Sequence, residues 1–312
     1  MPAIVDILLA TYNGEQYLNI QLQSIFEQDF QDFRILIRDD GSADSTRDII
    51  AQWVNLHPDK VIEIRDEQKN VGATANFSIL MEHASAEYIC FSDQDDKWLP
   101  NKISTQLAAI QQLEGNNRNI PAFVFSDLTL CDEQLNITHP SLNDRDHLDP
   151  DCIQAHRLLM QNVPYGCATM INKALLQQST PIPREALLHD HWLAVSAALL
   201  GKIAFIDESL LLHRIHQRNA SRAESQHKKE AKEGIENKLS NANFHNYLFK
   251  QVAQAEALLN RHQPLLKTEQ IKMLQNFILL KSTRGMQRKM LIIRNRFFKN
   301  NLLPTLKLLL RA

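Results

Sequence analysis

Glycine is scarce in this chain, with eight among 312 residues, and none of them belongs to a GxGxxG fingerprint or a Walker P-loop. Both motifs hold a phosphate on backbone amides that glycine leaves open. Their absence argues against a phosphate cradle lined by glycine. If the protein binds a diphosphate, a metal ion or charged side chains must balance the negative charge.

Cysteines and long apolar runs are also few. The four cysteines are far apart and form no CxxC pair, so we expect buried free thiols in a reducing cytosol, and neither a zinc site nor disulfides. No apolar run is long enough to span a bilayer, and Asp6 interrupts the apolar stretch near the N-terminus. These features argue against a signal peptide and favour a cytoplasmic protein.

Charge is nearly balanced but unevenly placed. The net charge is −2, yet residues 271–312 contain ten Lys/Arg and no Asp/Glu, which leaves the rest of the chain near −12. Apolar residues alternate with the basic ones, as in helices that lie on anionic bilayers. A helical hairpin that packs on the main domain, or on a second copy in a homodimer, explains the pattern equally well. The segment carries no recognised nucleic-acid-binding motif.

Strand and helix patterns alternate over the first hundred residues, which predicts βαβ units and a largely parallel sheet. The expected strands are 4–10, 33–37, 61–64 and 87–91, and the expected helices are 15–28, 44–56 and 74–84. Further strands are expected at 122–125, 166–171, 203–206 and 210–212, and helices at 190–200, 244–259, 268–281 and 286–298. The highly charged segment 221–234 is expected to be a mobile linker or an exposed helix. We therefore predict an α/β domain over residues 1–220 and a helical, basic region over 221–312.

Polar clusters follow three of the expected strands, at residues 11–14, 39–42 and 92–96. Ligands of parallel sheets bind outside the carboxyl ends of the strands, so an active site is expected there. The last cluster, Ser92-Asp93-Gln94-Asp95-Asp96, holds three carboxylates in four residues. Such carboxylates repel one another unless a cation or hydrogen bonds neutralise them, and a divalent metal needs hard oxygen ligands. The alternative is an acidic surface turn that caps the next helix.

Four segments occur in a characteristic order and spacing. They are Ala10-Thr11-Tyr12-Asn13-Gly14, Asp39-Asp40-Gly41-Ser42-Ala43-Asp44-Ser45-Thr46, Asn70-Val71-Gly72 and Ser92-Asp93-Gln94-Asp95-Asp96. Together they resemble the signature of family 2 glycosyltransferases, over roughly residues 1–220. This resemblance implies a GT-A fold, which is Rossmann-like with a mostly parallel sheet and flanking helices. The acidic run followed by Trp98, Pro100 and Lys102 is similar to the rhamnosyltransferase branch of surface polysaccharide synthesis.

The resemblance also implies roles for individual residues. It assigns the nucleotide and donor contacts to Thr11, Tyr12, Asn13, Glu15, Asp39, Asp40, Asn70, Asn76, Asp93, Gln94 and Arg214. It assigns a divalent metal, Mn²⁺ or Mg²⁺, to Asp95, Asp96 and His216, the general base to Asp190, and acceptor stacking to Trp192. Simpler roles remain open: turn and capping residues at 39–42, an N-cap at Asp190, a structural histidine at His216 and a core aromatic at Trp192.

These roles imply an inverting glycosyltransferase with a dTDP- or UDP-sugar donor, rhamnose being the first choice. The acceptor is expected to be a hydroxyl of a surface polysaccharide or lipid-linked glycan, at the inner face of the cytoplasmic membrane. A nucleotidyltransferase is one alternative, but such enzymes carry a Gly- and Lys/Arg-rich phosphate loop early in the chain, which is absent here. A degenerate binding protein is another, and the intact set of aspartates argues against it.

Overall fold

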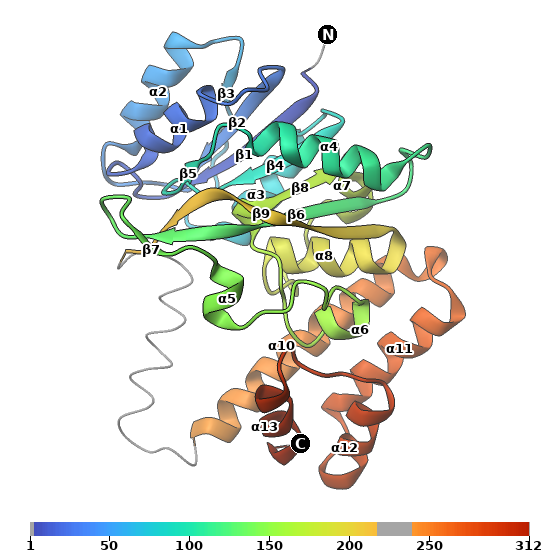
Figure 1. Ribbon diagram of the computed structural model, residues 1–312. Coiled ribbons are helices and arrows are strands. Elements are labelled where there is room, and N and C mark those ends of the chain that lie inside the picture. The colour runs from blue at the N-terminus through green and yellow to red at the C-terminus, as the bar shows by residue number, and fades with distance from the viewer. Residues whose placement is uncertain (1–2, 217–238, 312) are drawn as a thin grey trace.

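A nine-stranded sheet forms the centre of the molecule (Figure 1). The structure is a computed structural model that describes residues 3–216 and 239–311, so the charged segment 221–234 lies outside the described residues. The strands are β1 (Val5–Thr11), β2 (Phe33–Asp39), β3 (Val61–Glu63), β4 (Tyr88–Ser92), β5 (Lys97–Trp98), β6 (Ala122–Cys131), β7 (Ile137–His139), β8 (Thr169–Asn172) and β9 (Lys202–Arg214). Their order is β3-β2-β1-β4-β8-β6-β9-β5, with β7 paired to β6.

Helices cover both faces of this sheet (Figure 1). They are α1 (Leu18–Phe26), α2 (Thr46–Leu56), α3 (Ala73–His83), α4 (Lys102–Glu114), α5 (Leu142–Asp146), α6 (Ala155–Leu158), α7 (Lys173–Ser179), α8 (His189–Leu200), α10 (Leu239–His262), α11 (Thr268–Ile278), α12 (Gly285–Arg294) and α13 (Leu302–Arg311). Short 3₁₀ turns lie at η1 (Gly166–Ala168), η2 (Gln263–Leu265) and η3 (Leu279–Lys281). One core packs α1, α2 and α4 on the sheet, and the other packs α3, α7 and α8 on its opposite face.

The expected α/β class is confirmed, and the sheet is mixed. Strand β1 is parallel to β2 and β4, and β2 is parallel to β3. Val5, Ile7 and Leu9 of β1 point into the core on the α1 side, and Leu8 points into the core on the α8 side. This burial on both faces explains the nearly continuous apolar run. Strand β6 is also parallel to β9, whereas β8 pairs antiparallel with β4 and β6, and β5 pairs antiparallel with β9. The prediction of a largely parallel sheet therefore holds for β1 to β4 and for the β6–β9 pair, and the short strands β5, β7 and β8 make the sheet mixed.

Several expected boundaries were wrong for local reasons. Helix α1 begins at Leu18 because residues 14–17 form hydrogen-bonded turns before it. The strands expected at 203–206 and 210–212 are one strand, β9, whose register against β6 shifts near Ser126 and Asp127. Such irregularities let a long strand bend without ending. The sequence reasoning gave no strand at β5 or β7, and no helix at α4, α5, α6 or α7.

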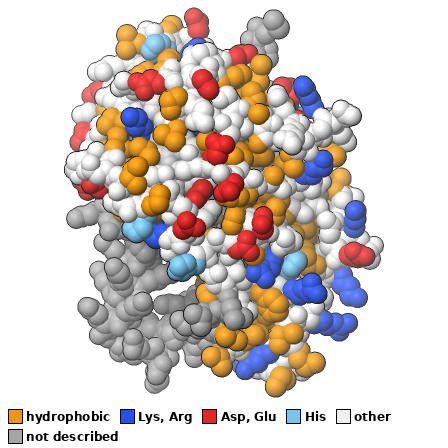
Figure 2. Space-filling view, in the orientation of Figure 1, with side chains coloured by type: hydrophobic (Ala, Val, Ile, Leu, Met, Phe, Trp, Pro, Cys, Tyr) orange, Lys and Arg blue, Asp and Glu red, His pale blue; other side chains and the backbone are white. Residues whose placement is uncertain are grey.

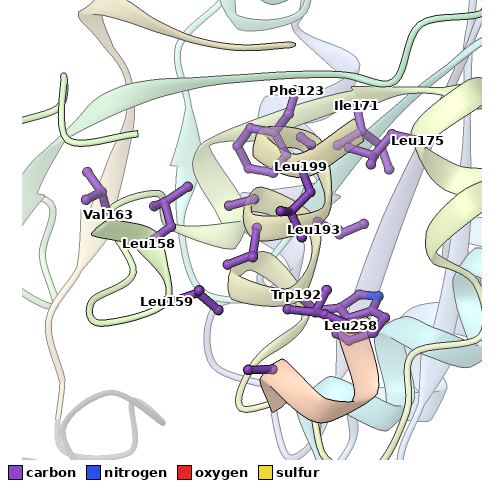
Figure 3. Packing of buried hydrophobic residues seen from close by; sticks show 14 of the residues in the cluster. Phe123, Leu158, Leu159, Val163, Ile171, Leu175, Trp192, Leu193, Leu199 and Leu258 are labelled. Carbon is purple, nitrogen blue, oxygen red and sulfur yellow. The ribbon is translucent and has the colours of Figure 1, made fainter. Parts of the chain in front are cut away.

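The C-terminal helices share one hydrophobic core with the sheet domain. Val252 and Leu258 of α10 and Phe277 of α11 belong to the same buried cluster as Trp192 and Leu193 of α8. Figure 3 shows Leu258 beside the Trp192 ring. One face of the C-terminal region therefore packs on the domain, which was one of the two alternatives that the sequence left open. Among the described helices, none combines the length and apolar character that crossing a bilayer requires.

We predict that Phe277→Ala lowers the free energy of unfolding of the whole chain by about 3–5 kcal/mol, because a buried aromatic leaves a cavity. All three tryptophans, Trp53, Trp98 and Trp192, lie outside the C-terminal helices. Urea unfolding followed by tryptophan fluorescence and by helical circular dichroism should shift together. Met286→Ala, at a position 71% exposed, is the control with little effect. A fluorescence midpoint that does not move would mean that the helices unfold separately.

Candidate active site

The carboxyl ends of β1, β2 and β4 lie side by side. Thr11 of β1 pairs with Asp39 of β2, and Leu9 of β1 pairs with Ser92 of β4. The Thr11 hydroxyl donates to the Asp39 carboxylate at 3.1 Å. All three polar clusters of the sequence therefore meet at one edge of the sheet, where α/β proteins bind ligands.

The loops after β1 and β4 are tied together by Gln94. Its side-chain amide donates to the carbonyl of Tyr12 and accepts from the N–H of Tyr12, both at 2.9 Å. The Tyr12 side chain remains 49% exposed. Asn13 has a φ of 49° and accepts a hydrogen bond from the N–H of Ala43, and Glu15 accepts one from the N–H of Ser45. Gln94, Asn13 and Glu15 thus shape this edge by binding backbone, and Tyr12 presents its ring outward.

Asp39 and Asp40 both bind the protein's own loops. The Asp39 carboxylate accepts from the N–H groups of Gly41 and Ser42 and from Arg47. Burial would raise the pKa of Asp39, but hydrogen bonds from Ser42 and Arg47 lower it below its usual range. The Asp40 carboxylate accepts from the N–H groups of Val71 and Gly72, each at 2.9 Å. Both carboxylates therefore fix the walls of the site.

Asn76 does not face the site. It is 2% exposed, and its amide binds the carbonyl and the guanidinium of Arg38. The expected contact between Asn76 and a nucleotide is therefore wrong: burial beside Arg38 uses both ends of the amide. Asn70 is exposed, with a φ of 54°, and its N–H donates to the carbonyl of Asp40 at 2.8 Å.

The acidic run after β4 divides into residues with different surroundings. Asp93 is partly exposed, and burial together with the charges of Asp96 and Asp95 raises its pKa to about 8. Asp95 lies next to His216, whose Nε2 is 2.7 Å from the Asp95 Oδ2. These two side chains are 12% and 8% exposed. Asp95 thus offers an oxygen ligand and His216 a nitrogen ligand next to Asp93, whose charge the neighbouring aspartates repel. This set of ligands fits a divalent ion such as Mn²⁺.

Asp96 points away from that pair, into the core. It is fully buried, and its Oδ1 lies 2.8 Å from Nδ1 of His213, a residue that the sequence reasoning did not select. Burial alone would lower the pKa of His213, but Asp96 and its neighbours raise it to about 9, so the ring is protonated at neutral pH. Cys167 lies beside Asp96 and His213, and the side-chain atoms of these three residues that could bind a metal lie within 4.8 Å of one another. The structure therefore pairs Asp96 with the His213 ring inside the core, and the expected role of Asp96 as a metal ligand stays a prediction.

Arg214 is also buried. Its guanidinium donates to the backbone carbonyls of Asp95 and Glu133 and lies 4.4 Å from the centre of the Tyr17 ring. The expected contact with a phosphate is replaced by contacts that fasten the end of β9 to the acidic run. This position of Arg214 follows from the pairing of β5 with β9, which places Lys97 opposite Leu212 and was not predicted from the sequence.

Asp190 opens α8 and faces this edge. Its carboxylate accepts from the N–H of Gly166 at 3.0 Å and from the N–H of His191 at 2.6 Å. Burial raises the pKa of Asp190 to about 7, and these two hydrogen bonds oppose the shift. Its charge also raises the pKa of Asp93. The structure thus places a carboxylate that can exchange a proton near neutral pH beside the acidic run.

The two aromatic neighbours of Asp190 in α8 are buried. Trp192 is fully buried and donates from Nε1 to the carbonyl of Ser179 at 3.0 Å. Its expected stacking on an acceptor sugar is therefore wrong, because the ring belongs to the core. His189 lies against the rings of Phe77 and Phe91, with centroids 4.1 and 5.3 Å away. Burial lowers the pKa of His189 to about 3, so this ring is neutral.

Comparison with known proteins shows which family this chain resembles. Residues 6–118 match the family described as glycosyl transferase family 2. The dTDP-rhamnosyl transferase RfbG of Shigella flexneri is 41% identical over 114 residues, which is 36% of this chain and 38% of that protein. The chain thus spans under two fifths of that relative's length.

Two solved structures have a similar fold. Staphylococcus aureus TarS, residues 1–349, in complex with UDP aligns with 91% of this chain and 72% of its own, with a TM-score of 0.57 and 16% identity. The mannosyltransferase PcManGT from Pyrobaculum calidifontis, in complex with GDP-Man and Mn²⁺, aligns with 95% of this chain and 85% of its own, with a TM-score of 0.54 and 14% identity. At these identities the alignments support the fold alone.

We predict that Gly166→Ala is destabilising by about 1–3 kcal/mol, because the new Cβ would lie 2.4 Å from Nε2 of His189. Gly166 also positions Asp190, so activity should fall with stability. The double variant Gly166→Ala/His189→Ala removes the clashing ring. Urea unfolding should show that it loses less free energy than the two single variants added together. Strict additivity would contradict the close contact.

Proposed function

We propose, on the premise that this chain belongs to the family 2 glycosyltransferases and has a GT-A fold, that it is an inverting enzyme of surface glycan synthesis. The family uses nucleotide-sugar donors. The finer proposal is supported by the pairing of Asp95 with His216 and by the electrostatic interaction of Asp190 with Asp93 of the same acidic run. We assign the chemistry to residues 1–220 and an accessory role to residues 221–312.

Donor binding is assigned to the loops at the ends of β1, β2 and β4. Thr11, Asn13, Asp39, Asp40 and Gln94 hold these loops in place before a ligand arrives, which lowers the entropy cost of binding. Tyr12 and Asn70 remain exposed for contact with the nucleotide. Asp95 and His216 would hold a divalent metal, which when bound supplies Lewis acidity to the diphosphate.

Asp190 is proposed as the general base. It would remove the proton of an acceptor hydroxyl while that oxygen attacks the anomeric carbon. The new glycosidic bond forms on the face opposite the breaking bond to the diphosphate, which leaves with the bonding electron pair. One carboxylate suffices for this single displacement, and the product has the inverted configuration. A pKa of about 7 suits the role, because the base is then ionised yet basic enough near neutral pH.

A dTDP- or UDP-linked donor is proposed, with rhamnose as the first sugar to test. The support is the partial match to a dTDP-rhamnosyl transferase, 41% identical over 114 residues. The acceptor is proposed to be a hydroxyl of a surface polysaccharide or a lipid-linked glycan at the cytoplasmic face of the membrane. Both the family match and the intact set of carboxylates argue against a nucleotidyltransferase or an inactive binding protein.

The donor and the metal are tested together by thermal shift and donor hydrolysis. We expect dTDP-rhamnose, among a panel with UDP-glucose, UDP-galactose and UDP-GlcNAc, to raise the melting temperature only when Mn²⁺ is present, because ligand binding stabilises the folded state. Asp95→Asn and His216→Gln should each lose the part of the rise in melting temperature that depends on Mn²⁺. His139→Gln, on the exposed strand β7, is the matched control. Full metal dependence in Asp95→Asn would remove the metal assignment, and a response to another donor would replace rhamnose.

The base assignment predicts opposite effects of Asp190→Asn on activity and stability. Turnover should fall by about 10²–10⁴-fold, and the rise of the wild-type rate with pH through about 7 should disappear. The folded-state pKa exceeds the usual value of 3.8, so the stability present below that value is lost as pH rises through about 7. Asp190→Asn should therefore be more stable than wild type at pH 8, by about 1–3 kcal/mol, with a smaller difference at pH 5.

The matched control for this experiment is Asp59→Asn, at an exposed position before β3. It should change neither the pH–rate profile nor the melting temperature at either pH. Near-normal turnover in Asp190→Asn would exclude the residue as the base, whatever its effect on stability.

A further inference from the structure

Helix α12 presents apolar side chains on both of its faces. Ile292 and Arg288 are buried toward the core, whereas Met286, Met290 and Ile293 are 71%, 64% and 54% exposed. The three exposed residues have the spacing i, i+4, i+7, so they form one stripe along the helix. The core therefore explains only one face of this helix.

Helix α13 and the 3₁₀ turn η3 add to this exposed surface. Leu306 and Leu310 of α13 are 46% and 80% exposed and are also four residues apart, and Leu279 is 48% exposed. Figure 2 shows apolar and basic side chains gathered at the end of the molecule where Figure 1 places α12 and α13. We define Leu279, Met286, Met290, Ile293, Leu306 and Leu310 as the basic apolar face.

The charge around this face has one sign. Residues 271–312 carry ten Lys/Arg and no Asp/Glu. Lys281, Arg284, Arg294 and Arg296 are exposed. Large exposed apolar side chains on a segment whose charged residues are all cationic complement an anionic bilayer, where the apolar groups enter the interface and the cations meet lipid phosphates.

We propose that the basic apolar face rests on an anionic lipid bilayer. A second copy of the chain is the weaker occupant, because a two-fold interface places the same patch against itself and would bring like charges together. The exposed apolar residues of this face lie on helices or a 3₁₀ turn, whose backbone groups bond within the element, so docking need not desolvate an extended backbone.

The same region is fastened to the active site. Asn300 accepts from the N–H of Asp149 at 2.6 Å and donates to its carbonyl at 3.0 Å, and Arg157 donates to the carbonyl of Lys299 at 2.8 Å. The segment that contains Asp149 and Arg157 leads directly to Gly166, which binds Asp190. Docking would thus hold the base near acceptors in the membrane, and this last step rests on the proposed function.

The test is co-sedimentation of the full chain with vesicles of phosphatidylcholine alone or mixed with phosphatidylglycerol. We expect binding to the mixed vesicles only, and a loss of roughly tenfold or more in Met286→Gln/Met290→Gln/Ile293→Gln. Leu56→Gln/Ile137→Gln, at positions 71% and 64% exposed elsewhere, is the matched control and should bind normally. Arg284→Gln/Arg294→Gln should weaken binding by roughly tenfold as well.

A second readout separates insertion from loose attraction. Ile293→Trp should show, relative to the wild-type chain with its three native tryptophans, a blue shift of emission with mixed vesicles and quenching by lipids brominated in their chains. No vesicle binding by the wild-type chain would overturn the proposal, as would normal binding by the triple variant. Light scattering that shows a dimer, lost in the triple variant and without vesicle binding, would assign the face to a second copy. Metal-dependent donor hydrolysis should persist in every variant. If the wild-type chain itself shows no such hydrolysis, that result would count against the proposed function and not against membrane docking.

Discussion

The repulsion among three carboxylates at the end of one buried strand is the constraint on which the rest of this site depends. The groups that oppose it come from the end of β9 and the residues just after it, and buried Lys102 of α4 also interacts with Asp96. His213 lies against Asp96, Arg214 binds the backbone of Asp95, and His216 lies against the Asp95 carboxylate. The short antiparallel pairing of β5 with β9 brings these groups into place, because β5 directly follows the acidic run. The two-residue strand β5 therefore brings the residues that oppose this repulsion next to the acidic run.

Burial then separates residues that look equivalent in the sequence. Asp95 and Asp96 are neighbours with the same side chain, yet one lies at the rim and the other has no exposed surface. A fully buried carboxylate is costly without a positive partner, and protonated His213 supplies one. Only the carboxylate at the rim remains within reach of a ligand. Asp96 therefore holds the loop through His213, and Asp95 is the aspartate of this pair that we propose as a metal ligand.

These differences explain how far sequence reasoning reached. Alternating strands and helices with polar residues at the strand ends were enough to predict the α/β fold and the edge that carries the site. The roles of Asn76, Trp192 and Arg214 could not be predicted, because they depend on which way each side chain points. A residue that follows a motif at the right spacing can turn into the core, as Trp192 does beside Ser179. Spacing along the chain determines proximity to the site, and tertiary packing determines contact with it.

The position of Asp190 shows why the C-terminal helices matter to residues outside them. Gln254 of α10 accepts from the N–H of Leu187 at 2.8 Å and lies 3.3 Å from Nδ1 of His191, so it holds both sides of Asp190. Gln251 of the same helix donates to the carbonyls of Leu159 and Met160. A carboxylate whose pKa is raised by burial needs surroundings that exclude water and resist relaxation. Because α10 provides that support, the proposed base and the surface formed by the C-terminal helices are held by the same packing, although the family match ends at residue 118.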